Sequence, residues 1–198
     1  MTKSEHNSLV KRIARYESDE RLQHTLRVEA LAVELARFWH VPEDQARMAA
    51  LLHDVAKDMP HDQLIRIACK SEDPLVRDMS STPASVVLHA PVGSLIARDE
   101  FGVTDARILC AIAFHTTGDP SMDDLSKITF LADYCEEGQH FDGVKEVRRL
   151  LYQDLDRAMA VALRQILAYV AQHGWPLDER TARAEQAFSR EALQARQP

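Results

Sequence analysis

The sequence predicts an all-α protein. Glycine is scarce, with six residues among 198, while alanine and leucine are plentiful, and this composition favours helices over sheet. Hydrophobic residues recur at helical spacing through most of the chain. No stretch alternates polar and apolar residues in the way that a half-buried strand does. We therefore expect a bundle of helices.

Capping residues and apolar spacing place the helices of the first third of the chain. Ser18 and the two acidic residues after it are suited to the cap and first turn of a long helix. Pro42 suits the first turn of another helix, which we expect to end near His53 and Asp54. The expected helices span residues 7–16, 19–39, 42–56 and 61–69.

The rest of the chain begins with an irregular segment, residues 71–84, in which Pro74 and Pro83 favour a loop or a broken helix. Gly174 is a good stop signal for a long helix before it. The expected helices span residues 84–101, 104–115, 121–135 and 143–172, with a last one from 176 onward. We divide the chain into an N-terminal helix (1–18), a central domain (19–172) and a charged C-terminal helix (173–198).

Charge and cysteine usage limit the functional classes. The formal charge of −7 argues against a general nucleic-acid-binding protein, which would need a basic face. Three widely spaced cysteines fit a reducing compartment better than a disulfide scaffold. The sequence shows no signal region and no run of 18 apolar residues. We expect a soluble cytoplasmic protein that is not membrane-bound.

The stretch of residues 51–58, L-L-H-D-V-A-K-D, carries the first candidate site. His53 and Asp54 are common metal ligands, but adjacent residues on a helix point about 100° apart. They can share a metal site if the helix ends there, or if Asp54 bridges to a second ion. Taken alone, the pair is more often an exposed dipeptide without a function.

Four histidines lie on or at the end of apolar helices, which predicts partial burial: His24, His53, His89 and His115. Asp133 also follows an apolar run, and an unpaired buried carboxylate costs several kcal/mol. A single histidine of this kind is usually a core residue, and an arginine could pair with Asp133. Together with Asp54, however, these residues offer six nitrogen and oxygen donors, enough for two divalent ions.

Five motifs connect these residues in order. They are H-T-L-R-V (24–28), L-L-H-D-V-A-K (51–57), H-A-P-V-G (89–93), F-H-T-T-G (114–118) and K-I-T-F-L-A-D-Y (127–134). Over about residues 20 to 155 the chain resembles the HD-domain metal-dependent phosphohydrolases. Within them it resembles the YqeK-like branch of symmetrical bis(5'-nucleosyl)-tetraphosphatases. The resemblance implies an HD-domain helical bundle with a metal site in its core.

The resemblance also implies the ligands and the reaction. His24, His53, Asp54 and Asp133 would be the primary metal ligands, while His89 and His115 would serve a second metal or bind phosphate. The cofactor would be one or two divalent transition-metal ions, with iron expected first and manganese or zinc as alternatives. The activity associated with the branch is hydrolysis of diadenosine tetraphosphate to two ADP by a metal-bound hydroxide.

Further residues are expected to contact the substrate. Arg27 lies one turn after His24 and could reach an oligophosphate, and Lys57 could supply a second cation. Without the resemblance, each would as readily be a solvated surface charge. We assign catalytic roles to Asp54, Arg27 and Lys57. The expected substrate-binding set is Arg27, Lys57, His89, His115, Thr116, Thr117 and Gly118.

The chain departs from the family pattern after Asp133. Relatives often have E-P-x-R there, whereas this chain has Glu137 in place of proline and Gln139 in place of arginine. These changes leave the metal ligands intact but put the substrate in doubt. The alternatives are an HD-domain nucleotidase or phosphodiesterase for another nucleotide, and a non-catalytic nucleotide-sensing module. The apolar stripe of residues 143–172 also makes a homodimer possible.

Overall fold

The computed structural model describes residues 1–74, 76–77 and 87–194, and the regular elements in these ranges are helices, without a strand. The all-α prediction is confirmed. In chain order the helices are α1 (Lys3–Ile13), α2 (Asp19–Phe38), α3 (Glu43–Leu52), α4 (His61–Lys70), α6 (His89–Asp99), α7 (Ala106–Phe114), α8 (Asp124–Cys135), α9 (Val144–Leu150), α10 (Leu155–Gln172) and α11 (Glu179–Gln194).

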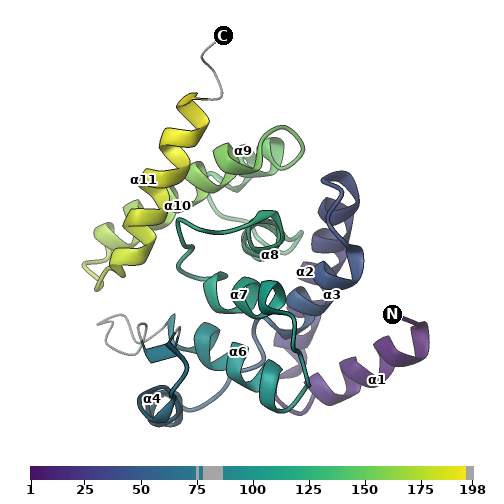
Figure 1. Ribbon diagram of the computed structural model, residues 1–198. Coiled ribbons are helices and arrows are strands. Elements are labelled where there is room, and N and C mark those ends of the chain that lie inside the picture. The colour runs from purple at the N-terminus through teal and green to yellow at the C-terminus, as the bar shows by residue number, and fades with distance from the viewer. Residues whose placement is uncertain (75, 78–86, 195–198) are drawn as a thin grey trace.

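Helix α8 lies at the centre of the bundle (Figure 1). It packs against α2, α3, α7, α9 and α10, and buried residues lie on most of its circumference. An all-round apolar helix of this kind is stable only when other helices enclose it. Asp133, in the last turn of α8, is therefore carried into the middle of the protein.

The predicted helix starts follow from side-chain caps. The Ser18 hydroxyl accepts a hydrogen bond from the backbone N–H of Arg21 and begins α2 as expected. The Asp105 and Asp123 carboxylates cap α7 and α8 in the same way. Such caps satisfy backbone N–H groups that the first helical turn leaves without partners.

Two predicted elements were wrong in their bounds. The first helix spans Lys3–Ile13 instead of residues 7–16, because Thr2 and Glu5 form a capping box at its start. The expected helix over 143–172 is broken into α9 and α10. Asp154 has an extended backbone, with φ of −166°, and its carboxylate caps α10. Both helices pack on α8, so one apolar stripe continues across the break.

The remaining bounds differ by a few residues. Helix α6 spans His89–Asp99 and is shorter than the expected helix over residues 84–101. The irregular segment predicted at 71–84 lies mostly outside the described residues. Helix α11 starts at Glu179 and packs along α10, where it buries Phe188. The division of the chain into three parts stays a prediction.

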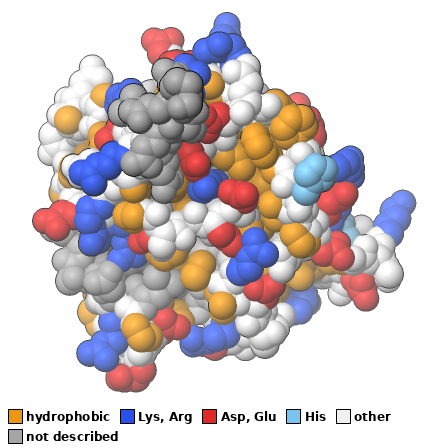
Figure 2. Space-filling model, turned by 45° about the horizontal axis from the view of Figure 1, so that its top comes forward, with side chains coloured by type: hydrophobic (Ala, Val, Ile, Leu, Met, Phe, Trp, Pro, Cys, Tyr) orange, Lys and Arg blue, Asp and Glu red, His pale blue; other side chains and the backbone are white. Residues whose placement is uncertain are grey.

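The surface agrees with the mixed charge of the sequence. On the face in Figure 2, acidic and basic side chains are interspersed, with hydrophobic side chains among them. The negative formal charge is therefore not gathered on one side of this face. Among the helices that the structure describes, none has both the length and the hydropathy needed to span a membrane.

Candidate metal centre

The ends of five helices bring the six predicted ligands together. His24 comes from the early turns of α2, and Asp133 from the last turn of α8. His53 and His115 are the residues that cap the C-terminal ends of α3 and α7, and His89 begins α6. Asp54 follows His53 directly. Apart from Asp133, the six residues are buried. His24 is 8% exposed, and the other four are almost fully buried.

Helix α3 ends directly before His53 and Asp54, close to where the sequence predicted. The last residue of the helix is Leu52, and residues 53–58 follow as turns. The α-helical hydrogen bonds stop at this point, although His53 itself keeps helical dihedral angles, with φ of −58° and ψ of −41°. Asp54 Oδ2 lies 3.5 Å from His53 Nε2.

Asp54 divides the ligands into two groups. Its Oδ1 atom lies 3.3 Å from His89 Nε2 and 3.4 Å from His115 Nε2. We call His89 and His115 the second half of the cluster. The Oδ2 atom of Asp54 lies 3.5 Å from His53 Nε2 and 4.0 Å from His24 Nε2. The carboxylate thus presents one oxygen to each group of imidazoles.

The first half of the cluster comprises His24, His53 and Asp133. Asp133 Oδ1 lies 3.0 Å from His24 Nε2 and 3.7 Å from His53 Nε2. The three ligand atoms all lie within 4.8 Å of one another, and the same holds for those of His53, Asp54 and His115. Each triad is compact enough to surround one ion. The Asp133 side chain is 27% exposed, so it also faces the opening of the site.

His53 and His115 are oriented by the same local arrangement. The Nδ1 atom of His53 lies 2.7 Å from the carbonyl oxygen of Ala50, and that of His115 lies 2.7 Å from the carbonyl oxygen of Ile112. In each case the imidazole donates to a carbonyl three residues earlier, at a helix end where such carbonyls lack partners. Donation from Nδ1 leaves Nε2 as the basic nitrogen that faces the cluster.

Glu136 has the same function for His24, and sequence reasoning missed it. The carboxylate is 2% exposed, and its Oε1 atom lies 3.2 Å from His24 Nδ1. Oε2 accepts hydrogen bonds of 2.6 Å from Arg27 Nε and from the backbone N–H of Gly138. Arg148 supports this loop by donating to three of the backbone carbonyls of residues 135–139. The loop sequence gave no physical signal, because His24 is 112 residues away.

Buried atoms without partners indicate that the cluster fits a cation. His53 Nε2 and Asp54 Oδ1 are buried and make no hydrogen bond, whereas His24 Nε2 has the Asp133 carboxylate beside it. A buried polar atom left without a partner is costly, and one divalent ion would satisfy several at once. The helices α3, α7 and α8 point their negative C-terminal ends at the site, which favours positive charge there. Mixed imidazole and carboxylate donors suit iron, manganese or zinc better than magnesium.

The ionisation of Asp54, Asp133 and His89 agrees with this interpretation. Burial opposes the charge of Asp54, but the surrounding imidazoles, His53 foremost, outweigh burial and hold the pKa of Asp54 well below its usual range. The pKa of Asp133 is also lowered, because neighbouring imidazoles outweigh burial there. Burial lowers the pKa of His89 to about 4, so its ring is neutral at pH 7. Ionised carboxylates and neutral imidazoles are the forms that bind metals.

A polar cavity of about 580 Å³ opens over the first half of the cluster, and three cations line it. Arg21, His24 and Arg27 follow one another at intervals of three residues on α2, and Lys57 comes from the turn after Asp54. Arg21 was missed in the sequence, although the spacing that pointed to Arg27 applies equally to it. Arg21 Nη1 donates to Asp54 Oδ2 over 3.0 Å.

Lys57 and Gln139 also approach the site. Lys57 Nζ lies 3.3 Å from His89 Nε2, which places its charge beside the second half of the cluster. Gln139 lines the cavity, and its amide nitrogen lies 3.5 Å from the carbonyl oxygen of Asp133. The residue that departs from the family pattern is thus at the edge of the cavity.

The turn of residues 116–118 is placed differently. The Thr117 hydroxyl is buried and donates to the carbonyl of Gly118. Gly118 has a φ of +66°, and a Cβ atom there would meet Leu163 and Ala184 at 3.2 and 3.3 Å. Gly118 therefore packs against α10 and α11. The Thr116 hydroxyl is buried without a hydrogen-bond partner. A substrate contact for these three residues stays a prediction.

Comparison with known proteins decides the family. The family model described as "HD domain" matches residues 21–138, which include all six ligands. The chain belongs to the HD domain family. The five sequence motifs therefore pointed to the correct family.

Three HD-domain relatives carry the name symmetrical bis(5'-nucleosyl)-tetraphosphatase. The protein from Halalkalibacterium halodurans is 36% identical over 81% of this chain and 84% of its own. The Bacillus subtilis protein is 34% identical with the same coverage of both chains. The Staphylococcus aureus protein is 32% identical over 82% of this chain and 84% of its own.

A solved structure shares the HD-domain fold. It is the crystal structure of a predicted HD superfamily hydrolase involved in NAD metabolism from Clostridium acetobutylicum. It superimposes with a TM-score of 0.84 at 31% identity, and the match covers 93% of this chain and 97% of that one. The match therefore extends beyond the family segment, over nearly the whole length of both chains.

Proposed function

We propose that this protein is a divalent-metal-dependent phosphohydrolase that cleaves diadenosine tetraphosphate symmetrically into two ADP. The observation that carries the proposal is the Asp54 carboxylate, which presents one oxygen to each half of a six-residue ligand cluster. The three relatives named symmetrical bis(5'-nucleosyl)-tetraphosphatases support the choice of substrate.

The position of each residue indicates whether it would hold a metal ion or bind the phosphate chain. His24, His53, Asp54 and Asp133 would hold one ion, and Asp54, His89 and His115 a second. Bound divalent ions would lower the pKa of a water molecule and offset charge on the phosphoryl oxygens. Arg21, Arg27 and Lys57 line the cavity over the cluster and would hold the phosphate chain by charge-assisted hydrogen bonds.

The positions of Arg27 and Lys57 bear on which anhydride bond of the substrate is hydrolysed. Arg27 pairs with Glu136, which contacts His24 of the first half, whereas Lys57 lies 3.3 Å from His89 of the second half. A phosphate chain held at both points would place an inner anhydride bond over the metal ligands, since positioning restricts which bond can react. Thus we expect central cleavage.

A product-resolved assay tests the function. Purified protein is loaded with iron, manganese or zinc, incubated with diadenosine tetraphosphate, and the nucleotides are separated by chromatography. We expect ADP as the product, with iron the most active ion and magnesium poor, because four of the six candidate ligands are imidazoles. Accumulation of ATP and AMP, or an absence of turnover with every metal, would contradict the proposal.

A second candidate is hydrolysis of another nucleotide. Gln139 at the edge of the cavity favours it, because a neutral amide replaces an arginine that is frequent in relatives. The assay therefore includes mononucleotides, diadenosine triphosphate and NAD, the last because the solved structure from Clostridium acetobutylicum is described as involved in NAD metabolism. A higher kcat/KM on one of these than on diadenosine tetraphosphate would select the second candidate.

A further inference from the structure

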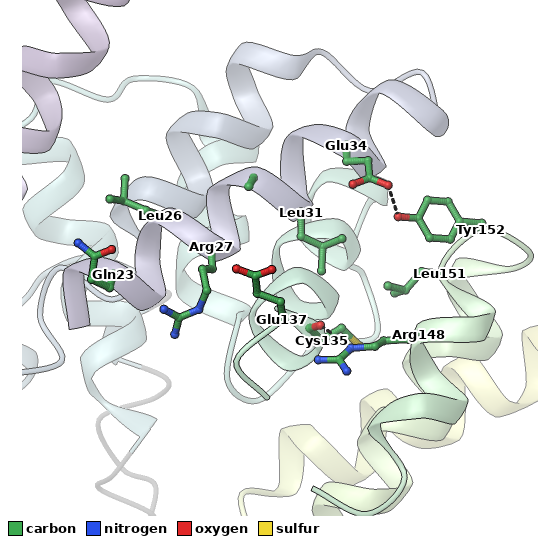
Figure 3. Close-up of a pocket in the computed structure, with 11 residues that line it drawn as sticks. Gln23, Leu26, Arg27, Leu31, Glu34, Cys135, Glu137, Arg148, Leu151 and Tyr152 are labelled. Carbon is green, nitrogen blue, oxygen red and sulfur yellow. Dashed lines mark hydrogen bonds between the residues drawn. The ribbon is translucent and has the colours of Figure 1, made fainter. Parts of the chain in front are cut away.

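A second cavity, of about 600 Å³, lies beside the metal centre between α2 and the segment that leads into α10. Figure 3 shows side chains of α2 on one side of it and Glu137, Leu151 and Tyr152 on the other. Arg27 lines both this cavity and the one over the metal ligands. The two spaces are therefore neighbours that share one guanidinium group.

The walls of this cavity differ from those of the metal centre. Leu26, Leu31 and Leu151 give it apolar sides, and the Tyr152 ring stands at one end. Its volume is within the range of small-molecule sites, roughly 300 to 1,000 Å³. Apolar sides with an aromatic ring suit a flat heterocycle, because bases stack on aromatic side chains.

The acidic side chains of this cavity suit hydrogen-bond donors. Glu34 and Glu137 line it together with Arg27 and Arg148, and Arg148 already donates to backbone carbonyls of residues 135–139. Carboxylates accept hydrogen bonds, and a purine amino group and ribose hydroxyls are donors. The Tyr152 hydroxyl donates to Glu34 over 2.5 Å, and burial and Glu34 raise the pKa of Tyr152 to about 12, so it remains a donor.

We propose that this cavity binds the nucleoside at one end of the substrate, while the phosphates of that end pass Arg27 to reach the metal centre. The assignment rests on the proposed function in that it takes a nucleotide to be the substrate. Arg27 faces both spaces, so it would contact the phosphates nearest the nucleoside. Its pairing with Glu136 fixes the guanidinium at this junction.

The test separates nucleoside binding from phosphate binding. Leu31→Trp fills the cavity without touching the metal ligands, and Leu177→Trp, at an exposed leucine outside it, is the matched control. The probes are ADP and inorganic pyrophosphate, titrated calorimetrically into metal-loaded protein of verified metal content. For Leu31→Trp we expect ADP to bind at least tenfold more weakly and pyrophosphate within twofold of wild type, with no change for Leu177→Trp. Unchanged ADP affinity, or an equal loss for both probes, would overturn the assignment.

A measurement on the unmodified protein covers the case in which Leu31→Trp does not fold. Adenosine, which has no phosphate, is titrated into metal-loaded protein with labelled leucine methyl groups. We expect the methyl resonances of Leu26, Leu31 and Leu151 to shift while those of Leu177 do not. If adenosine moves none of the first three, the cavity is not a nucleoside site. Failure of the protein to hydrolyse diadenosine tetraphosphate would sink the proposed function but leave these binding results readable.

Discussion

The two halves of the ligand cluster have similar imidazoles but different charge. The first half adds Asp133 to two histidines, with Asp54 shared, and its opening faces the solvent-filled cavity. The second half has His89 and His115 with only the shared Asp54, and Lys57 lies 3.3 Å from His89. A cation entering the second half would meet one carboxylate fewer and one ammonium group more.

Because of this difference in charge, we expect an ion in the first half to bind more tightly than an ion in the second half. Each additional carboxylate attracts a divalent ion strongly at these distances, and a nearby ammonium group opposes it. The first half therefore resembles a permanent site. The second half is suited to an ion that comes with the negatively charged substrate, since phosphate would offset the charge of Lys57.

Asp54→Asn should have the largest effect, because it removes a carboxylate that both halves share. Hydrolysis should fall by more than about 100-fold, beyond the range typical for residues that only support a ligand. Metal content by mass spectrometry should fall to well below one ion per chain. Retention of normal metal content would mean that the halves do not depend on Asp54.

Separate changes in the two halves come next. His24→Ala should remove the tightly bound ion and most of the activity, whereas His89→Ala should keep about one ion and lose activity mainly through a higher KM. The measurement is metal stoichiometry after extensive dialysis, together with kcat and KM. The comparison between the halves fails if both variants lose the same ion, or if His89→Ala loses more metal than His24→Ala.

Glu136→Gln should weaken the first half without removing a ligand. Burial opposes protonation of His24, but Asp133 and Glu136 outweigh it and raise its pKa, so Glu136 is part of the charge that holds this imidazole. We expect metal affinity to fall by about 10- to 100-fold, the usual effect of losing a group that orients a ligand. A titration with a competing chelator measures it.

Glu43→Gln is the matched control for that change. Glu43 also receives two hydrogen bonds from one arginine, Arg37, but its side chain is partly exposed at the start of α3 and does not line the cavity over the ligands. The metal affinity of the Glu43→Gln variant should equal that of the wild type. If both variants lose affinity equally, the effect of Glu136 is general destabilisation.

The smallest effect on activity is expected at Glu17, a buried carboxyl group that belongs to neither half. Burial raises its pKa to about 7, and its one hydrogen bond comes from the Thr25 hydroxyl. The folded state thus binds its proton more tightly than the unfolded chain, whose pKa is near 4.5. Its contribution to stability is complete below pH 4.5 and is lost as the pH rises through 7, by about 3 kcal/mol in total.

Urea unfolding of chelator-treated protein at several pH values measures this contribution. Glu17→Gln keeps a group of similar shape but cannot ionise, so its stability should fall less than that of the wild type between pH 5 and 8. Metal content should stay normal. Identical pH dependence in the two proteins would show that Glu17 is not buried in its neutral form.

The sequence predicted where the candidate ligands lie along the helices, because local signals mark the helix ends near most of them; their role as ligands stays a prediction. His53 follows an apolar run that stops. Asp105 and Asp123 cap the starts of α7, which ends just before His115, and of α8, whose last turn holds Asp133. Where the helices end was therefore readable from capping residues and apolar spacing. That these ends converge came from the family resemblance and not from periodicity.

Supporting contacts and helix breaks were less readable. Glu136 lies in a loop whose path depends on Arg148 holding its carbonyls, and such long-range contacts leave no periodic pattern. The break between α9 and α10 was hidden because both helices bury the same kind of residue against α8. The signal for this break in the sequence is Asp154, whose carboxylate caps the N–H group of Arg157 three residues later and marks the start of α10.

The ligands lie at the ends of five helices, from residue 24 to residue 133, and this spacing has a mechanical consequence. A bound ion would act as a cross-link that closes long chain segments, much as a disulfide does in a secreted protein. Losing the ion would then loosen the bundle as a whole. The same event that ends catalysis would also expose the chain to proteases, so metal supply would set the lifetime of the protein as well as its rate.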